Sequence, residues 1–316
     1  ERAVASHHRY VTLDPAAAPP QVPTFATAGE ALEWLEDEYA TLIAAVEHAA
    51  TSDRPSRAWR LAAMLWHFLN IRKLYSDWIA VNRVALQAAR RDGDQAAEAL
   101  VLHSTGAVHA QRYEYDVAVD CLYRALELRE ALADSAGQSA TLTVLGSTYA
   151  MSNRPEQALD CLRRAVDICR DGADPAATAQ ALHNLGNFLL LRNENEEAIH
   201  WLKEAIAVCP ETNHFSVGLT LLSLVEAYLN VGDTSAALDS LDRAEEIGRQ
   251  LRSGYIEAMA TSLRAACYLA LDRNEEAADA AGRAVRAFEA IGEQFELGQA
   301  LERLGQALAA GGDHAG

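Results

Sequence analysis

Apolar residues in the stretch 181–210, ALHNLGNFLLLRNENEEAIHWLKEAIAVCP, follow two helical patterns on either side of the polar segment RNENEE. In the first pattern, leucines recur three and four residues apart, which is the spacing of one face of an α-helix. Gly186 interrupts this pattern, although glycine is a poor helix former. In the second pattern, the small residues Ala198 and Ala205 share one face. The stretch therefore predicts two helices in close contact, with Gly186 and Ala198 at their crossing.

The same pattern recurs along the chain with a period of 40 residues, shortened once to 39. Three columns of small residues define the register. The first helix of each copy carries Gly106, Gly146, Gly186, Val225, Ala265 and Gly305. The second helix carries Ala118, Ala158, Ala198, Ala237 and Ala277, followed by Ala125, Ala165, Ala205, Ala244 and Ala284. A fixed period of this length predicts an all-α solenoid, in which each helical hairpin buries its apolar face against its neighbours.

The spacing within each hairpin resembles the tetratricopeptide repeat. The matching positions of one copy are Leu182, Leu185, Gly186, Leu189, Ala198, Leu202, Ala205 and Pro210. The usual repeat of that family has about 34 residues, so the period of 40 implies longer helices. The resemblance implies a right-handed superhelical solenoid with a concave groove lined by the first helices. Where Val225 or Ala265 replaces the glycine, we expect a slightly wider helix crossing.

The chain divides into four predicted segments. Residues 1–28 are rich in proline, which predicts an extended linker held against the first helices by Val22 and Phe25. Residues 29–93 predict an amphipathic helix over 29–51 and a degenerate hairpin, with Trp66 and Trp78 in place of glycine and alanine. Residues 94–293 predict five regular hairpins, and residues 294–316 a capping helix with a tail. The solvating face of that last helix is predicted to carry Glu296, Gln299, Glu302, Arg303 and Gln306.

Polar residues mark the expected helix ends. Pro155 and Pro175 each follow shortly after a polar residue, as expected where a helix begins. We expect helix caps at Asn193, Asp233 and Asn274.

Composition excludes several classes of partner. The formal net charge is −18, which argues against direct nucleic-acid binding because phosphate neutralisation needs clustered Lys and Arg. No apolar run approaches the ~20 residues of a membrane-spanning helix, so we expect no membrane contact. The five cysteines form no C-x-x-C motif, which predicts reduced core thiols in a cytoplasmic protein. The chain begins at Glu1 rather than methionine, and we expect it to be a fragment of a longer protein.

Motifs for catalysis are absent from the sequence. It contains no phosphate-binding G-x-x-x-x-G-K-[ST], no H-E-x-x-H and no G-x-S-x-G. His103 and His183 occupy equivalent positions in two copies, but a metal site needs three or four converging ligands. We therefore predict no catalytic site, no metal and no cofactor.

A second row of first-helix residues, here called the partner row, follows the spacing Gln180, His183, Asn187 and Leu190. In tetratricopeptide proteins this row lines the groove. Its candidate binding residues are His67, Asn70, His103, Thr143, Ser147, Gln180, His183, Asn187, Leu190, Leu219, Leu222, Glu226, Leu229 and Met259. Some of these leucines are equally suited to packing between repeats. The row lacks the arginine cluster that an anionic ligand needs, so we expect a protein segment, an amphipathic helix or a small apolar effector.

The N-terminal third gives a more specific resemblance. Its elements are A-x-x-W-L-x-x-E from residue 31, W-R-L-A from 59, D-W at 77 and A-L-x-A-A-R-R-x-G-D from 85. Together with the repeats, they resemble the repeat domain of Streptomyces antibiotic regulatory proteins (SARP) that carry an NB-ARC nucleotide-binding module. The resemblance implies a non-catalytic sensor domain of a transcriptional regulator. Its partner, which could be another domain of the same full-length chain, would bias an upstream ATPase and DNA-binding module.

Two alternatives remain open from the sequence. One is a stand-alone tetratricopeptide scaffold that binds peptides of another protein. The other is an enzyme whose site has no recognised motif.

Overall fold

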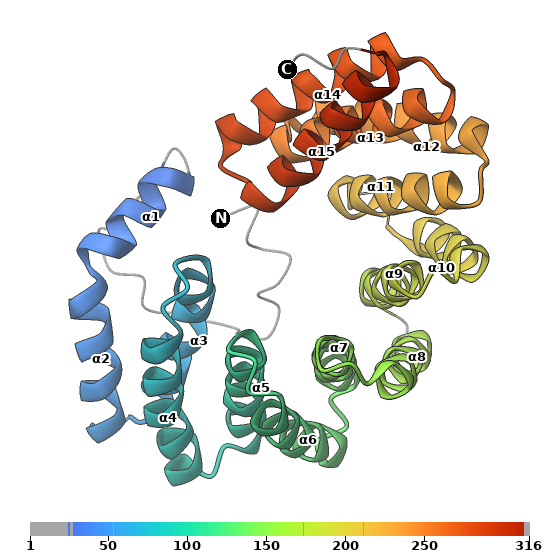
Figure 1. The fold of residues 1–316 in the computed structure, drawn as a ribbon. Helices are drawn as coiled ribbons and strands as arrows, with labels where there is room; N and C mark the ends of the chain where they lie inside the picture. The colour runs from blue at the N-terminus through green and yellow to red at the C-terminus, as the bar shows by residue number, and fades with distance from the viewer. Residues whose placement is uncertain (1–24, 26–27, 53, 173, 211, 313–316) are drawn as a thin grey trace. The chain divides into compact units, whose positions relative to one another are not determined.

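The computed structural model describes residues 25, 28–52, 54–172, 174–210 and 212–312. Every regular element within those residues is an α-helix, and successive helices pack as hairpins (Figure 1). This confirms the prediction of an all-α solenoid of helical hairpins. The chain forms two compact units, Glu1–Ala158 and Leu159–Gly316, whose boundary lies within α8 (Pro155–Asp171). The right-handed superhelix and the division into four segments stay predictions, and residues 1–24 of the expected linker, Val22 included, lie outside the described residues.

The first unit begins with a bent helix rather than the single predicted helix over 29–51. Its helices are α1 (Ala28–Asp37), α2 (Tyr39–Thr51), α3 (Ser56–Ile71), α4 (Tyr75–Asp92), α5 (Gln95–Gln111), α6 (Tyr115–Ala131) and α7 (Ser135–Met151). The prediction was wrong at Glu38, where the helical geometry is interrupted between α1 and α2. After this bend, the Tyr39 hydroxyl donates to an Asp77 carboxylate oxygen of α4 at 2.6 Å. Contacts with other helices thus set the direction of α2.

Two tryptophans fill the degenerate hairpin of α3 and α4. The rings of Trp66 and Trp78 meet edge to face with centroids 5.9 Å apart. Trp78 is buried, and its indole Nε1 donates to Ser104 Oγ of α5 at 2.8 Å. The large pair occupies the space that small residues and a leucine share in the regular hairpins.

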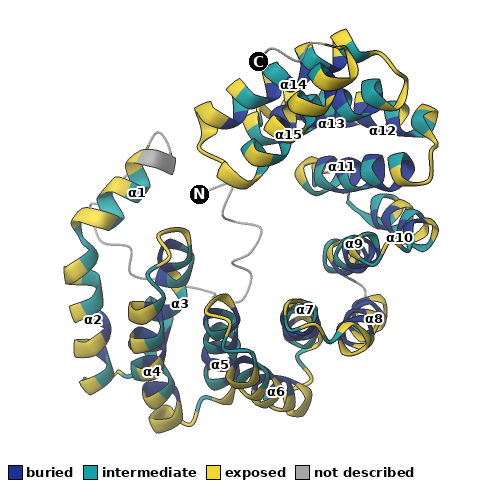
Figure 2. Ribbon diagram, viewed as in Figure 1, coloured by how far each residue is buried: buried dark blue, intermediate teal, exposed yellow. Residues whose placement is uncertain are grey.

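The second unit repeats the regular hairpin. Its helices after α8 are α9 (Pro175–Leu191), α10 (Asn195–Val208), α11 (His214–Asn230), α12 (Thr234–Leu251), α13 (Gly254–Ala270), α14 (Asn274–Ile291) and α15 (Gln294–Ala310). Buried residues form the sides of these helices that face one another (Figure 2). Two ion pairs, Arg163–Glu197 and Arg170–Glu204, also join α8 to α10.

A leucine of the second helix presses against the glycine of the first helix in both units. A Cβ atom on Gly186 would lie 2.7 Å from Leu202 Cγ and 3.5 Å from the Ala198 carbonyl oxygen. Gly106 faces Leu122 and the Ala118 carbonyl in the same way. These are the close contacts that the sequence predicted, and any larger residue at either glycine would force the helices apart.

One left-handed residue ends the first helix of each hairpin. The residues with positive φ at this position are Lys73, Tyr113, Asn153, Asn193, Gly232, Asp272 and, after α15, Gly312. After each of the first six, an N–H group bonds back to the carbonyl five residues earlier, for example Glu194 to Leu189 at 2.9 Å. This is the Schellman arrangement. The helix cap predicted at Asn193 is thus found at the C-terminal end of α9 rather than at the start of α10.

Side-chain caps start most of the first helices. Asp94, Asp134, Asp174, Asn213 and Ser253 each accept a hydrogen bond from a backbone N–H of the first turn. Asp233 caps α12 as predicted. Asn274, in contrast, is the first residue of α14 and makes no cap bond, so that prediction was wrong.

Histidines link neighbouring first helices within each unit. A ring nitrogen of His103 lies 3.4 Å from Thr141 Oγ1, and a ring nitrogen of His183 lies 3.1 Å from Thr220 Oγ1. Burial lowers the pKa of His183 to about 4. Burial, aided by the charge of Arg129, lowers the pKa of His103 to about 3. Both imidazoles are therefore neutral near pH 7 and serve as neutral links between repeats.

None of the five cysteines forms a disulfide. Cys161, Cys169 and Cys267 are buried, while Cys121 and Cys209 are half-buried. Burial raises the pKa of Cys161 and Cys267 to about 11, so these thiols stay protonated and act as small apolar side chains.

The helix crossing gives a first testable prediction. Gly186→Leu and Ala198→Leu should each lower the free energy of unfolding by about 1–3 kcal/mol through overpacking. Because both side chains would compete for the same crossing, the double variant should deviate from additivity. Gly305→Leu is the matched control, since a Cβ atom at Gly305 would meet nothing within 4 Å. Urea unfolding compares the four variants with the wild type, and equal losses at Gly186 and Gly305 would contradict the assigned contact.

The buried histidines give a second prediction. The unfolded chain binds a proton at His183 below pH ~6.5, whereas the folded chain does so only near its lowered pKa of about 4. The stability contributed by the neutral form is therefore present above pH ~6.5 and is lost as the pH falls from 6.5 towards 4. Between pH 7 and pH 5, His183→Gln should lose about 1–2 kcal/mol less stability than the wild type. His200→Gln, at an exposed position, is the control, and parallel profiles for all three proteins would refute the prediction.

Candidate functional site

The structure places the partner row on the first helices, with most of its members partly open to solvent. In the first unit, His67 and Asn70 lie on α3, His103 on α5, and Thr143 and Ser147 on α7. Ser147 is exposed and the other four are half-buried. The hydroxyls of Thr143 and Ser147 donate to carbonyls one turn earlier in their own helix. These two side chains therefore offer a partner only their acceptor lone pairs.

In the second unit the row combines apolar and polar side chains. Gln180, His183, Asn187 and Leu190 lie on α9, Leu219, Leu222, Glu226 and Leu229 on α11, and Met259 on α13. Leu190, Leu219, Leu229 and Met259 are half-buried and pack beside the core. Leu222 is only 3% exposed and belongs to the core itself. The prediction that Leu222 is available to a partner was therefore wrong, because this side chain packs between repeats.

A hydrogen-bonded chain fixes the orientation of Asn187. The Thr220 hydroxyl donates to the Ser216 carbonyl, so its oxygen accepts from the His183 Nδ1–H group. The other ring nitrogen, Nε2, then accepts from Asn187 Nδ2 at 3.0 Å. This assignment leaves the Asn187 carboxamide oxygen, Oδ1, as an acceptor with no partner among the described residues.

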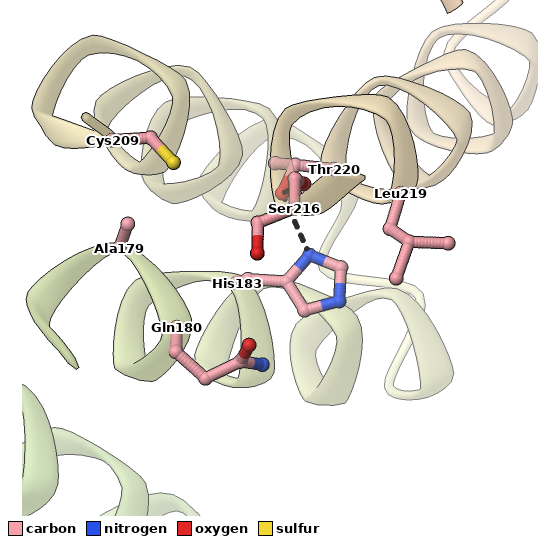
Figure 3. Close-up of a pocket in the computed structure, with 7 residues that line it drawn as sticks. All are labelled: Ala179, Gln180, His183, Cys209, Ser216, Leu219 and Thr220. Atoms are coloured by element: carbon pink, nitrogen blue, oxygen red, sulfur yellow. Dashed lines mark hydrogen bonds between the residues drawn. The ribbon is translucent and has the colours of Figure 1, made fainter. Parts of the chain in front are cut away.

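A small cavity lies beside this chain of hydrogen bonds (Figure 3). Its lining residues are Ala179, Gln180, His183, Cys209, Ser216, Leu219 and Thr220. The volume of about 10 Å³ is close to that of a single water molecule. The cavity therefore cannot hold an organic ligand, and a partner of the row would have to bind on the surface.

A pair of unlike charges lies on α11 and α15. Arg303 Nη1 donates to Ser262 Oγ of α13 at 2.6 Å. Burial raises the pKa of Glu226, and the positive charge of Arg303 partly offsets this effect. Burial also lowers the pKa of the Arg303 guanidinium. The two charges influence each other, yet no ion pair within 4.0 Å joins them in the described chain.

The unused polar atoms of this pair remain accessible. The Glu226 carboxylate has no hydrogen-bond partner among the described residues, and neither do the remaining guanidinium N–H groups of Arg303. None of these atoms is among the fully buried side-chain atoms that lack a partner. A ligand could therefore accept from Arg303 and donate to Glu226 at the same time.

Sequence patterns missed Arg303 as a binding candidate. Arg303 was predicted to lie on the solvating face of the last helix, but it is half-buried and reaches back to the preceding first helix. Glu296 also departs from that prediction, since it is half-buried and accepts from the Tyr255 hydroxyl at 3.2 Å. The sequence does contain a sign of this contact. Arg303 lies 41 residues after Ser262, which is one repeat period plus one residue, so the two occupy neighbouring positions on successive first helices.

A separate hollow of about 330 Å³ lies at α13 and α14, away from the partner row. Its lining residues are Tyr268, Glu275, Glu276, Asp279 and Arg283. The described residues contain no group of three or more His, Cys, Asp or Glu side chains that could hold a metal ion. Likewise, none of the described helices is long and apolar enough to cross a membrane.

Comparison with known proteins identifies the repeats. The family model of the tetratricopeptide repeat matches residues 96–171 and 177–250. A search of curated protein sequences finds no match.

Several solved structures share the fold. The apo form of RapI has a TM-score of 0.58 and 15% identity, over 81% of this chain and 98% of RapI. A Rap protein complexed with competence and sporulation factor has a TM-score of 0.58 and 15% identity, over 90% of this chain and 81% of the other. A signal transduction ATPase with numerous domains (STAND) from Pyrococcus horikoshii, which has a tetratricopeptide repeat sensor, has a TM-score of 0.63 and 15% identity. This last match covers 88% of the chain but 42% of the ATPase.

Identities this low establish a common fold and nothing finer. The matched repeats nevertheless agree with the close Gly–Leu crossings of α5 with α6 and of α9 with α10. Residues 96–171 and 177–250 therefore match the tetratricopeptide repeat, and the described helices form an all-α solenoid of that type.

Proposed function

We propose that the partner row of the second unit, together with Arg303, binds a peptide segment of a partner protein. The observation that carries this proposal is the set of unused polar atoms on Asn187, Glu226 and Arg303. A peptide group carries one N–H donor and one C=O acceptor. It can donate to Asn187 Oδ1 or Glu226 and accept from Arg303.

The apolar members of the row supply the remaining contact. Leu190, Leu219, Leu229 and Met259 are half-buried and keep part of their surface available. Covering that surface with apolar side chains of the partner would contribute roughly 25 cal/mol per Å² buried. The proposed ligand is thus an extended or helical segment that alternates apolar contacts with peptide-group hydrogen bonds.

The biological setting that we propose is a sensor domain of a larger regulator. The N-terminal resemblance to antibiotic regulatory proteins with an NB-ARC module supports it. So does the shared fold with an ATPase that has a tetratricopeptide repeat sensor. In this setting, partner binding to the repeats would shift an upstream ATPase and DNA-binding module between two states.

A stand-alone peptide-binding regulator is the second candidate. The fold shared with apo RapI extends over 98% of that chain. A related Rap regulator was solved in complex with the Phr* peptide, with a TM-score of 0.53 and 17% identity. The two candidates share the binding surface and differ only in what the binding controls.

The binding proposal predicts which variants lose affinity. A 12-residue peptide selected from a random display library against this chain is the probe. Asn187→Ala, Glu226→Gln and Arg303→Met should each weaken binding of the selected peptide at least tenfold, because each removes an unused hydrogen-bonding group. Gln306→Ala, at an exposed position on α15, is the control. Calorimetric affinities that all three substitutions leave unchanged would refute the proposed site.

Variants at two leucines of α11 distinguish a loss of binding from a loss of stability. Leu222→Ala should cost about 2–5 kcal/mol of stability, since its side chain is in the core. Leu229→Ala should lower the melting temperature much less and should weaken peptide binding. If both variants lose only stability, Leu229 contributes to packing and not to the binding surface.

The sensor proposal requires a measurement on the full-length protein. The ATP turnover rate is compared with and without the selected peptide, in the wild type and in Glu226→Gln. A peptide-dependent change in turnover that Glu226→Gln removes would support the sensor. If the full-length protein binds the peptide but hydrolyses no ATP, the result would support the stand-alone regulator instead.

A further inference from the structure

Three successive first helices of the second unit contribute to one polar cluster, here called the α13 cluster. Glu226 lies on α11, Tyr255 and Ser262 lie on α13, and Glu296 and Arg303 lie on α15. The two residues of each pair are seven positions apart, which is close to two helical turns, so each pair shares one face of its helix. Helix α13 packs against both α11 and α15 (Figure 1). The cluster thus extends from the partner row on α11 to α15.

Hydrogen bonds between helices occupy four of the five members of the α13 cluster. The Tyr255 hydroxyl donates to Glu296 Oε1 at 3.2 Å, and Arg303 Nη1 donates to Ser262 Oγ at 2.6 Å. Glu226 is half-buried, and its carboxylate accepts no hydrogen bond from the described residues. Within the cluster, the acceptor capacity of Glu226 therefore remains for a ligand.

Arg303 neutralises Glu226 only in part. Burial raises the pKa of the Glu226 carboxyl, and the positive charge of Arg303 offsets part of this rise. The same guanidinium also interacts with the charge of Glu302 on its own helix. No ion pair within 4.0 Å joins Arg303 to Glu226 in the described chain. Glu226 has therefore lost water from around its carboxylate without gaining a cation in contact, and a positively charged donor would offset that loss.

Negative charge predominates around the α13 cluster. The pKa of Tyr255 is raised to about 12, first by burial and then by the charges of Glu296, Glu293 and Glu226. Three carboxylates thus act on this one hydroxyl, whereas Arg303 is the cation that acts on Glu226. A surface with this balance attracts a positively charged group and repels a negatively charged one.

A cationic side chain satisfies Glu226 better than a peptide group alone. A peptide N–H donates one hydrogen bond but brings no charge. Hydrogen bonds between an ammonium or guanidinium group and a carboxylate are roughly twice as strong as bonds between neutral groups. Lysine and arginine side chains carry both the donors and the charge.

We propose that Glu226 determines the specificity of the peptide site by binding a lysine or arginine side chain of the partner segment. This inference rests on the function proposed for the partner row, and it names the kind of segment that the row selects. The basic side chain donates to the Glu226 carboxylate. A backbone carbonyl of the same segment accepts from the Arg303 N–H groups that Ser262 leaves unused.

Parallel selections test which residue type the site prefers. A random peptide display library is selected against the wild type, Glu226→Gln and Glu289→Gln. Glu289 is exposed on α14, so its substitution makes the same change in net charge away from the cluster. Elevated salt limits attraction by the overall charge of −18. Lysine or arginine should be enriched at one fixed position by the wild type and by Glu289→Gln, and this enrichment should disappear with Glu226→Gln.

A double-mutant cycle then tests the contact itself. One peptide selected by the wild type is synthesised with an acetylated amino terminus, so that its terminal amine carries no charge. Replacing its basic residue by methionine should weaken calorimetric binding at least tenfold to the wild type and to Glu289→Gln. The same replacement should weaken binding to Glu226→Gln by less than about threefold, because the partner of the basic group is already gone. The melting temperature of Glu226→Gln should equal that of the wild type, which separates lost affinity from lost folding.

The outcomes distinguish this inference from the proposed function. If binding depends on Asn187 and Arg303 but is equal for the wild type and Glu226→Gln, the inference is overturned while the peptide site remains. Equal losses for the methionine peptide with both proteins would also overturn it, because the basic residue would then bind elsewhere. Binding that acetylation abolishes would identify the terminal amine as the bound cation and likewise overturn it. A peptide affinity that is unchanged in Asn187→Ala, Arg303→Met and Glu226→Gln would overturn both.

Discussion

The contact between a glycine of the first helix and a leucine of the second helix in a hairpin determines the architecture of this protein. At Gly186 the absence of a side chain lets Leu202 fill the space directly over the backbone, and Gly106 and Leu122 repeat the arrangement in the other unit. The crossing fixes the rotation of the first helix about its axis. Consequently it decides which residues of that helix enter the core and which form the partner row. The function proposed for the row thus depends on a residue that never touches a partner.

Much of this fold could be predicted because its information is periodic. Columns of glycine, alanine and leucine repeat every 40 residues, so each copy confirms the register of the others. Features that occur once carry no such support. The interruption at Glu38 was missed because the apolar pattern runs through it without a break. Asn274 was misassigned because asparagine favours helix caps, yet it is the first residue of α14 and makes no cap bond.

The candidate site could be predicted to the level of a helix face and not to the level of individual atoms. Leu222 and Leu229 belong to the same row, yet Leu222 enters the core and Leu229 remains half-buried. Their difference depends on which side chains the neighbouring helices supply, and the spacing within α11 does not contain that information. Arg303 was assigned to solvent for a related reason. Its long side chain crosses to Ser262 on the preceding first helix, which a helical wheel of α15 alone cannot show.

Polar residues on the first helices have two roles. The first is to form hydrogen bonds between neighbouring repeats, and the second is to offer hydrogen-bonding groups to a partner. His103 and His183 have the first role, because one ring nitrogen of each is hydrogen-bonded to Thr141 or Thr220 of the following repeat. What remains for recognition is the set of atoms that this stacking leaves unused. On α9, the bond to His183 uses the amide nitrogen of Asn187 and leaves its oxygen free. On α11 and α15, Glu226 and Arg303 influence each other's charge without forming an ion pair, and Arg303 bonds to Ser262. The binding surface that we propose therefore lies where stacking between repeats leaves hydrogen-bonding groups unused, whereas the histidines most evident in the sequence are engaged by neighbouring repeats.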